Sequence, residues 1–138
     1  MKFTSFLLFR KKQTMWASYF SDCEQVINAI NKYLEAGKTG KSSIMIPSFH
    51  KDSVIFEGGK NEVGTHQIQG FFDLINTCGQ DPNPQPPHQI SILDITETTA
   101  VTRTVMEFHG TTYTDYHSLI KTPEGWLIVA KVYHTHTH

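Results

Sequence analysis

The chain has 138 residues, of which 38% are hydrophobic, 12% aromatic and 18% charged. This length suits one domain, because two cores of about 70 residues would each be marginally stable. The aromatic content excludes intrinsic disorder, and a formal net charge of −1 gives no basic face of the kind that binds nucleic acid. No apolar run is long enough to span a membrane. We therefore expect a globular protein that binds neither nucleic acid nor membrane.

The first 14 residues differ from the rest in charge, since they hold four basic residues and no acid. The apolar stretch Phe3–Phe9 is interrupted by polar residues and no small-residue cleavage site follows it, which does not indicate a signal peptide. We predict a poorly ordered extension over residues 1–14 and one domain over residues 15–138. An arm that touches a membrane or a partner is the alternative. Two cysteines without a secretory signal predict free, buried thiols and a cytoplasmic location.

The first half of the domain is predicted to be mostly helical. Ser21 and Glu24 form a capping box, which predicts that a helix begins there, and Gly37 predicts its end. The further elements expected in this half are a short helix over residues 39–45, a strand over His50–Glu57, and a helix that Thr65 caps and Gly79 ends.

The second half is predicted to be β structure. A connector with four prolines in seven residues (DPNPQPP, residues 81–87) precedes it. The strand signals that follow, separated by short turns, cover Gln89–Thr96, Ala100–His109, Thr111–Thr122 and Trp126–Thr135. Helices collected on one face of an antiparallel sheet make an α+β fold.

The last hairpin brings titratable residues together. If residues 123–125 form its loop, Asp115 faces Tyr133 and His117 faces Lys131, all on one side of the sheet. Such a carboxylate, imidazole and ammonium shift one another's pKa and support proton transfer. We therefore predict Asp115, His117 and Lys131 as the candidate catalytic residues. An exposed ion pair between Asp115 and Lys131 is the alternative.

The same register predicts the two faces of the hairpin. Tyr113, Leu119, Leu127 and Val129 are expected on the titratable face. The residues expected on the opposite face, as a packing surface, are Tyr116, Ile120, Trp126, Ile128, Ala130 and Val132. A slip of one residue would instead group Asp115 and His117 with His134.

The chain contains no Gly-rich phosphate loop, no CxxC pair, no HExxH and no G-x-S-x-G motif. The terminal His134, His136 and His138 would lie on one side of a continued strand and could bind zinc or nickel. A frayed chain end is favoured over that site. We therefore predict no metal and no cofactor.

Three segments resemble one known family. The stretch Thr114–His134 (TDYHSLIKTPEGWLIVAKVYH) resembles the closing hairpin of the putative lumazine-binding family. Phe49–Asp52 resembles the Phe-His-x-Asp before the family's first strand, and Tyr33–Gly37 resembles the end of its first helix. The family belongs to the nuclear-transport-factor-2-like (NTF2-like) superfamily, together with ketosteroid isomerase, scytalone dehydratase and polyketide cyclases. The resemblance covers residues 20–135 and is most specific at Asp115, Tyr116, Trp126, Lys131 and His134.

The resemblance implies a cystatin-like α+β cone, in which a strongly curved antiparallel sheet wraps about three helices and a pocket lies between them. It also implies a homodimer packed through the outer face of the sheet. In ketosteroid-isomerase-like relatives a carboxylate moves a proton while Tyr or protonated Asp stabilises the oxyanion. In this chain the corresponding base would be Asp115, and the corresponding donor would be Tyr113 or Tyr116. The counterparts of the two histidines of dehydratase relatives would be His50 and His117.

Three functions stay open, because this fold hosts enzymes, binders and scaffolds alike. We favour a dimer that binds a small, flat, partly apolar molecule without turnover, since no catalytic motif is complete. The second is an isomerase, dehydratase or cyclase, and the third is a structural dimer with a filled cavity. The candidate ligand-binding residues are Tyr33, Phe56, Phe72, Met106, Tyr113, Tyr133 and His134.

Overall fold

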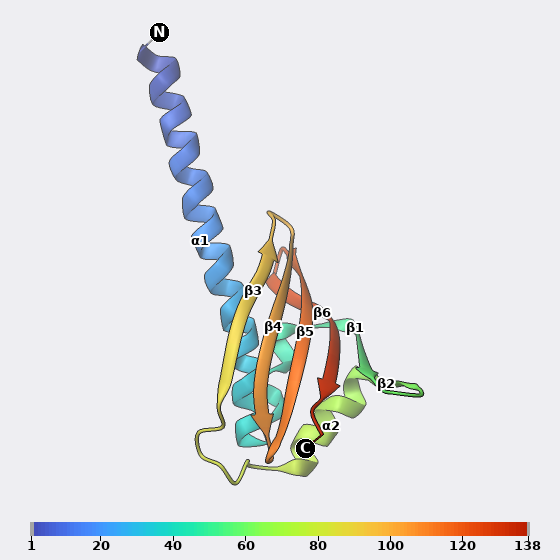
Figure 1. Cartoon of the computed structure of the whole chain (residues 1–138). Helices are drawn as coiled ribbons and strands as arrows, with labels where there is room; N and C mark the ends of the chain where they lie inside the picture. The colour runs from blue at the N-terminus through green and yellow to red at the C-terminus, as the bar shows by residue number, and fades with distance from the viewer. Residues whose placement is uncertain (1, 138) are drawn as a thin grey trace.

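The computed structural model describes residues 2–137, which form a six-stranded sheet with its helices on one side (Figure 1). The helices are α1 (Lys2–Thr39) and α2 (Ile68–Cys78), and the 3₁₀ turns are Ser42–Ile44 and Ile46–Ser48. The strands are β1 (Phe49–Gly58), β2 (Val63–Gln67), β3 (His88–Ile95), β4 (Thr99–Phe108), β5 (Thr111–Thr122) and β6 (Gly125–Thr135). Across these residues, neither helix has an apolar stretch that could span a bilayer.

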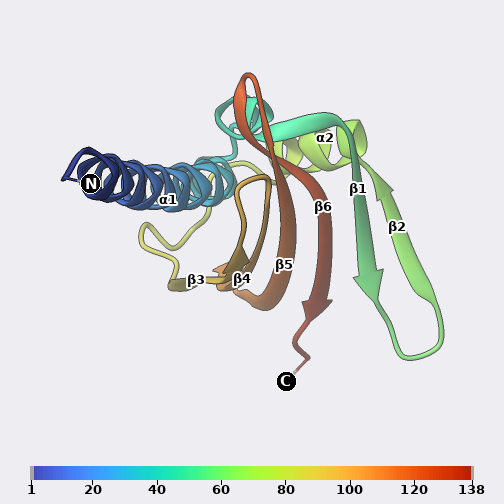
Figure 2. The same ribbon diagram turned by 90° about the horizontal axis from the view of Figure 1, so that it is seen from above.

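The strand order in the sheet is β2-β1-β6-β5-β4-β3. The predicted α+β class is confirmed, with two α-helices and two 3₁₀ turns on the inner side of a curved sheet (Figure 2). The sheet is mixed, whereas we expected it to be antiparallel throughout. The exception is β1, which pairs in parallel with β6 because the chain passes through four other strands before β6 returns beside it.

Helix α1 begins far upstream of the predicted capping box. Ser21 lies inside the helix, where its Oγ accepts a hydrogen bond from Gln25 Nε2 at 3.2 Å, so the prediction that the helix begins at Ser21 is wrong. No Gly or Pro interrupts the sequence from Lys2 to Ala36, and nothing therefore stops the helix there. Its 38 residues extend over about 57 Å, and its first turns project beyond the sheet (Figure 1). Poor order of residues 1–14 stays a prediction.

The ends of the two helices meet through glycines. The predicted end of α1 at Gly37 is two residues early, since the helix continues to Thr39 and Gly40 adopts a φ of 70°. A Cβ at Gly40 would lie 2.3 Å from the carbonyl carbon of Gly79, the residue that ends α2 as predicted. Both the left-handed backbone and the close approach therefore require glycine at position 40.

The segment before α2 is a strand that the sequence did not predict. We expected Thr65 to cap α2, but Thr65 pairs with Phe56 in the β1–β2 hairpin, and α2 begins at Ile68. The side chains of β2 are mostly exposed, so its sequence shows no alternation between buried and polar positions. Both cysteines are free, as predicted, but neither is fully buried: Cys23 is half-buried, and Cys78 at the end of α2 is exposed.

A β-bulge in β6 decides which side chains enter the core. Leu119 pairs with Ile128 and Ser118 pairs with Ala130, which leaves Val129 as an extra residue. Trp126 and Ile128 consequently point inward and are buried, and the prediction that they lie on the opposite face from the titratable row is wrong. The buried hydrophobic core between the helices and the sheet also includes Val26, Ile30, Tyr33, Ala36, Met45, Phe49, Phe72, Ile75, Met106 and Leu119.

Candidate functional site

The predicted row of titratable side chains lies on the inner face of the sheet. Asp115 on β5 pairs with Tyr133 on β6, and His117 pairs with Lys131, as the sequence predicted. Asp115 is 1% exposed, His117 0% and Lys131 5%. Burial of both charges excludes the alternative of a solvated surface pair between Asp115 and Lys131. Asp115, His117 and Lys131 lie farther from the hairpin turn than the bulge does, and there the predicted register is retained.

The Asp115 carboxylate has one occupied oxygen and one free oxygen. Its Oδ2 accepts a hydrogen bond of 2.5 Å from the Tyr33 hydroxyl, and Lys131 Nζ lies 3.8 Å from the same oxygen. Its Oδ1 is buried and has no hydrogen-bond partner among residues 2–137. Burial, and then the negative charge of Asp115, raises the pKa of Tyr33 well above its usual value, so Tyr33 stays a hydrogen-bond donor.

The Lys131 amine is surrounded by aromatic rings. Nζ lies 4.3 Å from the ring centroid of Phe71 on α2, 4.7 Å from that of Tyr133 and 4.9 Å from that of Tyr33 on α1. Burial lowers the pKa of Lys131, although the nearby carboxylate of Asp115 acts in the opposite direction. Desolvation is the stronger effect here because the side chain has almost no contact with solvent.

His117 is fully buried beside Asp115 and Lys131. Its ring lies edge-on to Tyr33 with centroids 4.8 Å apart, and neither ring nitrogen has a partner in the described part of the chain. Burial lowers its pKa to about 4, and Lys131 adds to this effect while Asp115 opposes it. Two buried threonines on β4 lie opposite these residues, since Thr102 pairs with His117 and Thr104 pairs with Asp115. The hydroxyls of both threonines also lack hydrogen-bond partners among residues 2–137.

An inner cavity of about 100 Å³ reaches Asp115 and Lys131. The remaining residues that line it are Tyr33, Gly37, Ile55, His66, Gly70, Phe71, Leu74, Ile75, Met106, Phe108, Tyr113 and Tyr133. It is smaller than a usual ligand pocket of ~300–1,000 Å³, so it suits a compound of few atoms or the reactive end of a larger one. An apolar wall with a carboxylate and an amine side by side is suited to bind and polarise such a group.

A second group of polar side chains holds Tyr133 at the cavity. The Tyr133 hydroxyl donates to Glu57 Oε2 at 3.1 Å and lies 3.1 Å from His66 Nε2, while Thr135 Oγ1 donates to Glu57 Oε1 at 2.9 Å. Burial and the bond to Glu57 raise the pKa of Tyr133. Sequence reasoning missed Glu57 and His66, because only the unexpected parallel pairing of β1 with β6 brings them to this place.

The structure divides the predicted ligand-binding residues into three groups. Those that line the inner cavity are Tyr33, Met106, Tyr113 and Tyr133. Phe72 instead packs in the core against Phe49, with ring centroids 5.7 Å apart. Phe56 and His134 lie on the outer face of the sheet, where Phe56 pairs with Val132 and both predicted residues are exposed. The expectation that Phe56 and His134 line the pocket is therefore corrected: strand alternation turns them away from it.

The histidine candidates outside the hairpin core do not converge on the cavity. His50 Nδ1 accepts a hydrogen bond from the backbone N–H of Asp52, and His50 is not part of the cavity lining. Among residues 2–137, no three His, Cys, Asp or Glu side chains come together as a metal site. His138, which the proposed zinc or nickel grip of the tail requires, lies outside the described residues.

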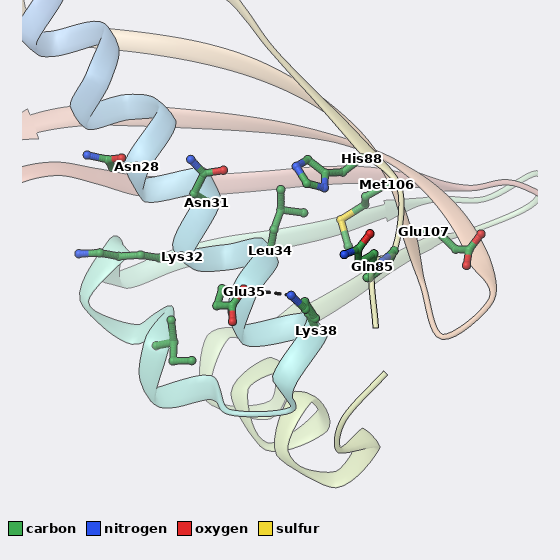
Figure 3. A pocket seen from close by; sticks show the side chains of 12 residues that line it. Asn28, Asn31, Lys32, Leu34, Glu35, Lys38, Gln85, His88, Met106 and Glu107 are labelled. Atoms are coloured by element: carbon green, nitrogen blue, oxygen red, sulfur yellow. Dashed lines mark ion pairs between the residues drawn. The ribbon is translucent and has the colours of Figure 1, made fainter. Parts of the chain in front are cut away.

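A larger, open groove of about 720 Å³ runs along the other side of α1. Figure 3 shows that its walls are α1 side chains, residues around Gln85 of the proline connector, and β4 side chains. Exposed Glu35 and Lys38 form an ion pair of 3.9 Å there, which solvent largely screens. Met106 contributes to both the groove and the inner cavity. The inner cavity, whose wall includes Asp115 with its buried and unpartnered Oδ1, is the better candidate site.

Comparisons with known proteins agree with this architecture. The family model described as "Putative lumazine-binding" matches residues 21–134. Aldolase FrzH from Cladobotryum sp. is 30% identical over 122 residues, which cover 84% of this chain and 93% of that protein. An NTF2-like protein of unknown function from Shewanella baltica OS155 is 32% identical, with a TM-score of 0.75 over 87% of this chain and 98% of that one. A similar protein from Methylobacillus flagellatus KT is 28% identical, also with a TM-score of 0.75, over 85% of this chain and 94% of that one.

Proposed function

Because the chain belongs to the putative lumazine-binding family and has an NTF2-like fold, as its sequence predicted, we propose that it binds a small carbonyl compound in the inner cavity and removes a proton next to the carbonyl. The observation that carries this proposal is the buried Oδ1 of Asp115, which has no partner among residues 2–137 and belongs to a residue of the cavity wall. The relative from Cladobotryum is named an aldolase, and an aldol reaction begins with the removal of such a proton.

Asp115 is the general base of the proposed reaction. Tyr33 and Lys131 both lie at Oδ2, which leaves Oδ1 free to accept a proton. A carbonyl bound beside Lys131 would have its developing negative charge stabilised by a positively charged nitrogen on the cavity wall. His117 has no role in the proposed proton transfer, because it does not line the cavity. Its pKa of about 4 leaves it uncharged at neutral pH.

Binding without turnover is the second candidate function, favoured by the apolar wall of the cavity and by its aromatic side chains. The flat, partly apolar ligand predicted from the sequence would bind between Phe71 and the tyrosines of the wall. In this case Asp115 and Lys131 would hydrogen-bond the polar edge of the ligand, since a free carboxylate oxygen accepts and an ammonium donates.

The proposal includes a homodimer through the outer face of the sheet. Phe56, Val132 and Tyr116 form a row across β1, β6 and β5 on that face, and they are 38%, 48% and 42% exposed. Ile120 and Val54 extend the exposed apolar surface. A contiguous apolar patch of this kind is typical of a protein–protein interface.

The test of the function is solvent exchange. Small ketones and 2-oxo acids are incubated with the protein in D2O, and the loss of the α-proton signal is followed by NMR. We expect Asp115→Asn to slow the exchange by about 10²–10⁴-fold, the usual contribution of a general base. Ser118→Ala, at an exposed position of the same strand, is the matched control and keeps the rate.

The outcomes separate the two candidate functions. Tyr33→Phe retains the carboxylate and serves as a second variant if Asp115→Asn does not fold, and it should also slow the exchange. Exchange by Asp115→Asn and Tyr33→Phe at the wild-type rate would refute the proposed base. If the wild type exchanges no α-proton yet is stabilised against heat by these compounds in a saturable manner, binding without turnover is the function.

A further inference from the structure

We propose that Lys131 is an amine nucleophile, which forms a Schiff base with the carbonyl group of the substrate. This inference rests on the proposed function and specifies the chemical step at the same site. Lys131 lies on the wall of the inner cavity, in contact with Phe71 of α2 and within 3.8 Å of the base Asp115. A substrate in the cavity therefore meets the amine and the carboxylate together.

No acceptor among residues 2–137 lies at hydrogen-bond distance from Nζ. An ammonium group has three N–H donors, but Nζ makes no hydrogen bond with any residue from 2 to 137, and its one ion-pair partner there, Asp115 Oδ2, lies at 3.8 Å. That separation exceeds the ~2.7–3.2 Å of an N–H···O hydrogen bond. The other groups that surround Nζ are the faces of aromatic rings, with centroids 4.3 to 4.9 Å away.

The same surroundings match a protonated Schiff base. An iminium nitrogen that carries the lysine carbon and the substrate carbon has a single N–H, and the Asp115 carboxylate is its ion-pair partner at 3.8 Å. Its positive charge is spread over carbon and nitrogen, and three aromatic faces attract such a cation. Burial also lowers the pKa of Lys131, which increases the fraction of free amine available for attack.

The covalent sequence balances with one proton taken from solvent and returned when the iminium is hydrolysed. The lone pair of the neutral Lys131 amine attacks the carbonyl carbon, and one N–H proton passes to the oxygen to give a carbinolamine. The solvent proton completes the leaving group, and the oxygen leaves as water to give the iminium ion with its single N–H. Asp115 Oδ1 then removes the α-proton, and the C–H electron pair forms the C=C bond of an enamine while the iminium electrons return to nitrogen. The enamine carbon regains a proton or attacks an aldehyde. Water hydrolyses the resulting iminium and restores the amine.

Reductive trapping tests this inference. The protein is incubated with acetone and then with sodium borohydride, which reduces an iminium to a stable N-isopropyl lysine, and peptide mass mapping locates the adduct. At pH 7.4 only about one exposed lysine amine in a thousand is unprotonated, so adducts at exposed lysines should be slow to form. Among the lysines, we expect one rapidly formed adduct, on Lys131.

Two variants serve as controls. Lys131→Arg keeps the charge but has no nucleophilic amine, and it should lose the rapid adduct; Lys131→Met serves in its place if the larger guanidinium disturbs folding. Lys32→Arg removes an exposed lysine of the outer groove and should leave the adduct unchanged. Absence of the adduct from the wild type, or its persistence in Lys131→Arg and Lys131→Met, overturns the inference.

The exchange assay distinguishes this inference from the proposed function. If Asp115-dependent α-proton exchange occurs in the wild type without any adduct on Lys131, the nucleophilic role is wrong and the proposed function stands. If the adduct forms on Lys131 but Asp115→Asn exchanges α-protons as fast as the wild type, the amine is the nucleophile and the assignment of Asp115 as base is wrong.

Discussion

Replacement of His117 by leucine should make the protein less sensitive to acid. In the folded state His117 is fully buried with a pKa of about 4, whereas an unfolded histidine has a pKa of about 6.5. As the pH falls below 6.5, the unfolded state binds a proton that the folded state does not, and stability is lost until the pH reaches about 4. Between pH 7 and pH 5 this single group removes about 2 kcal/mol from the free energy of unfolding.

Urea denaturation of the wild type and of His117→Leu at both pH values measures this difference. The variant should lose about 2 kcal/mol less than the wild type between pH 7 and pH 5, since leucine cannot take up the proton. At pH 7 it should be at least as stable, because two unpartnered ring nitrogens are replaced by an apolar side chain. The exposed His88→Leu is the control and should keep the wild-type dependence. An identical pH dependence in wild type and His117→Leu would refute the reasoning.

Three further changes test the packing and the assembly. Asp22→Ala removes the acceptor of the 3.0 Å hydrogen bond from Trp126 Nε1 and the 2.9 Å ion pair with Lys121. It should therefore lower the free energy of unfolding, measured by urea denaturation, by about 2 kcal/mol. An unchanged free energy of unfolding would contradict the inward position of Trp126. Gly40→Ala places a Cβ against the backbone at the end of α2 and strains a φ of 70°, so it should lower the free energy of unfolding by about 2 kcal/mol or more. A melting temperature equal to that of the wild type would exclude the close approach. Val132→Glu puts a charge at the centre of the outer apolar row and should convert the proposed dimer to a monomer in analytical ultracentrifugation. A cooperative thermal transition of the variant would show that the monomer is still folded. A variant that stays dimeric would place the interface elsewhere.

Local rules were sufficient for the titratable residues of the last hairpin, although Leu127, expected on the same face, pairs with the exposed Ile120. A two-sided strand pair joined by a short turn has few possible registers, so the pairing of Asp115 with Tyr133 and of His117 with Lys131 followed from the sequence alone. The same alternation gave the wrong side for Trp126, because the extra residue Val129 shifts the phase of the strand near the turn.

Contacts between distant segments were beyond the reach of such rules. The bond from Tyr33 to Asp115 joins residues 82 positions apart, and it depends on how α1 packs across the sheet. Glu57 reaches Tyr133 because β1 adds to the sheet in parallel beside β6. The upstream start of α1 was missed for a different reason: a good capping box such as that at Ser21 does not exclude a helix that simply continues through it.

The central claim is that the inner cavity, and not the larger outer groove, is the site that binds and acts on a ligand. The most direct test is an NMR titration of the isotope-labelled protein with cyclopentanone, a small ketone. The account predicts saturable shift changes for Phe71, Asp115 and Lys131 around the inner cavity, and their loss in Asp115→Asn. Shift changes confined to Asn31, Lys32 and Glu35 in the groove of Figure 3 would contradict it.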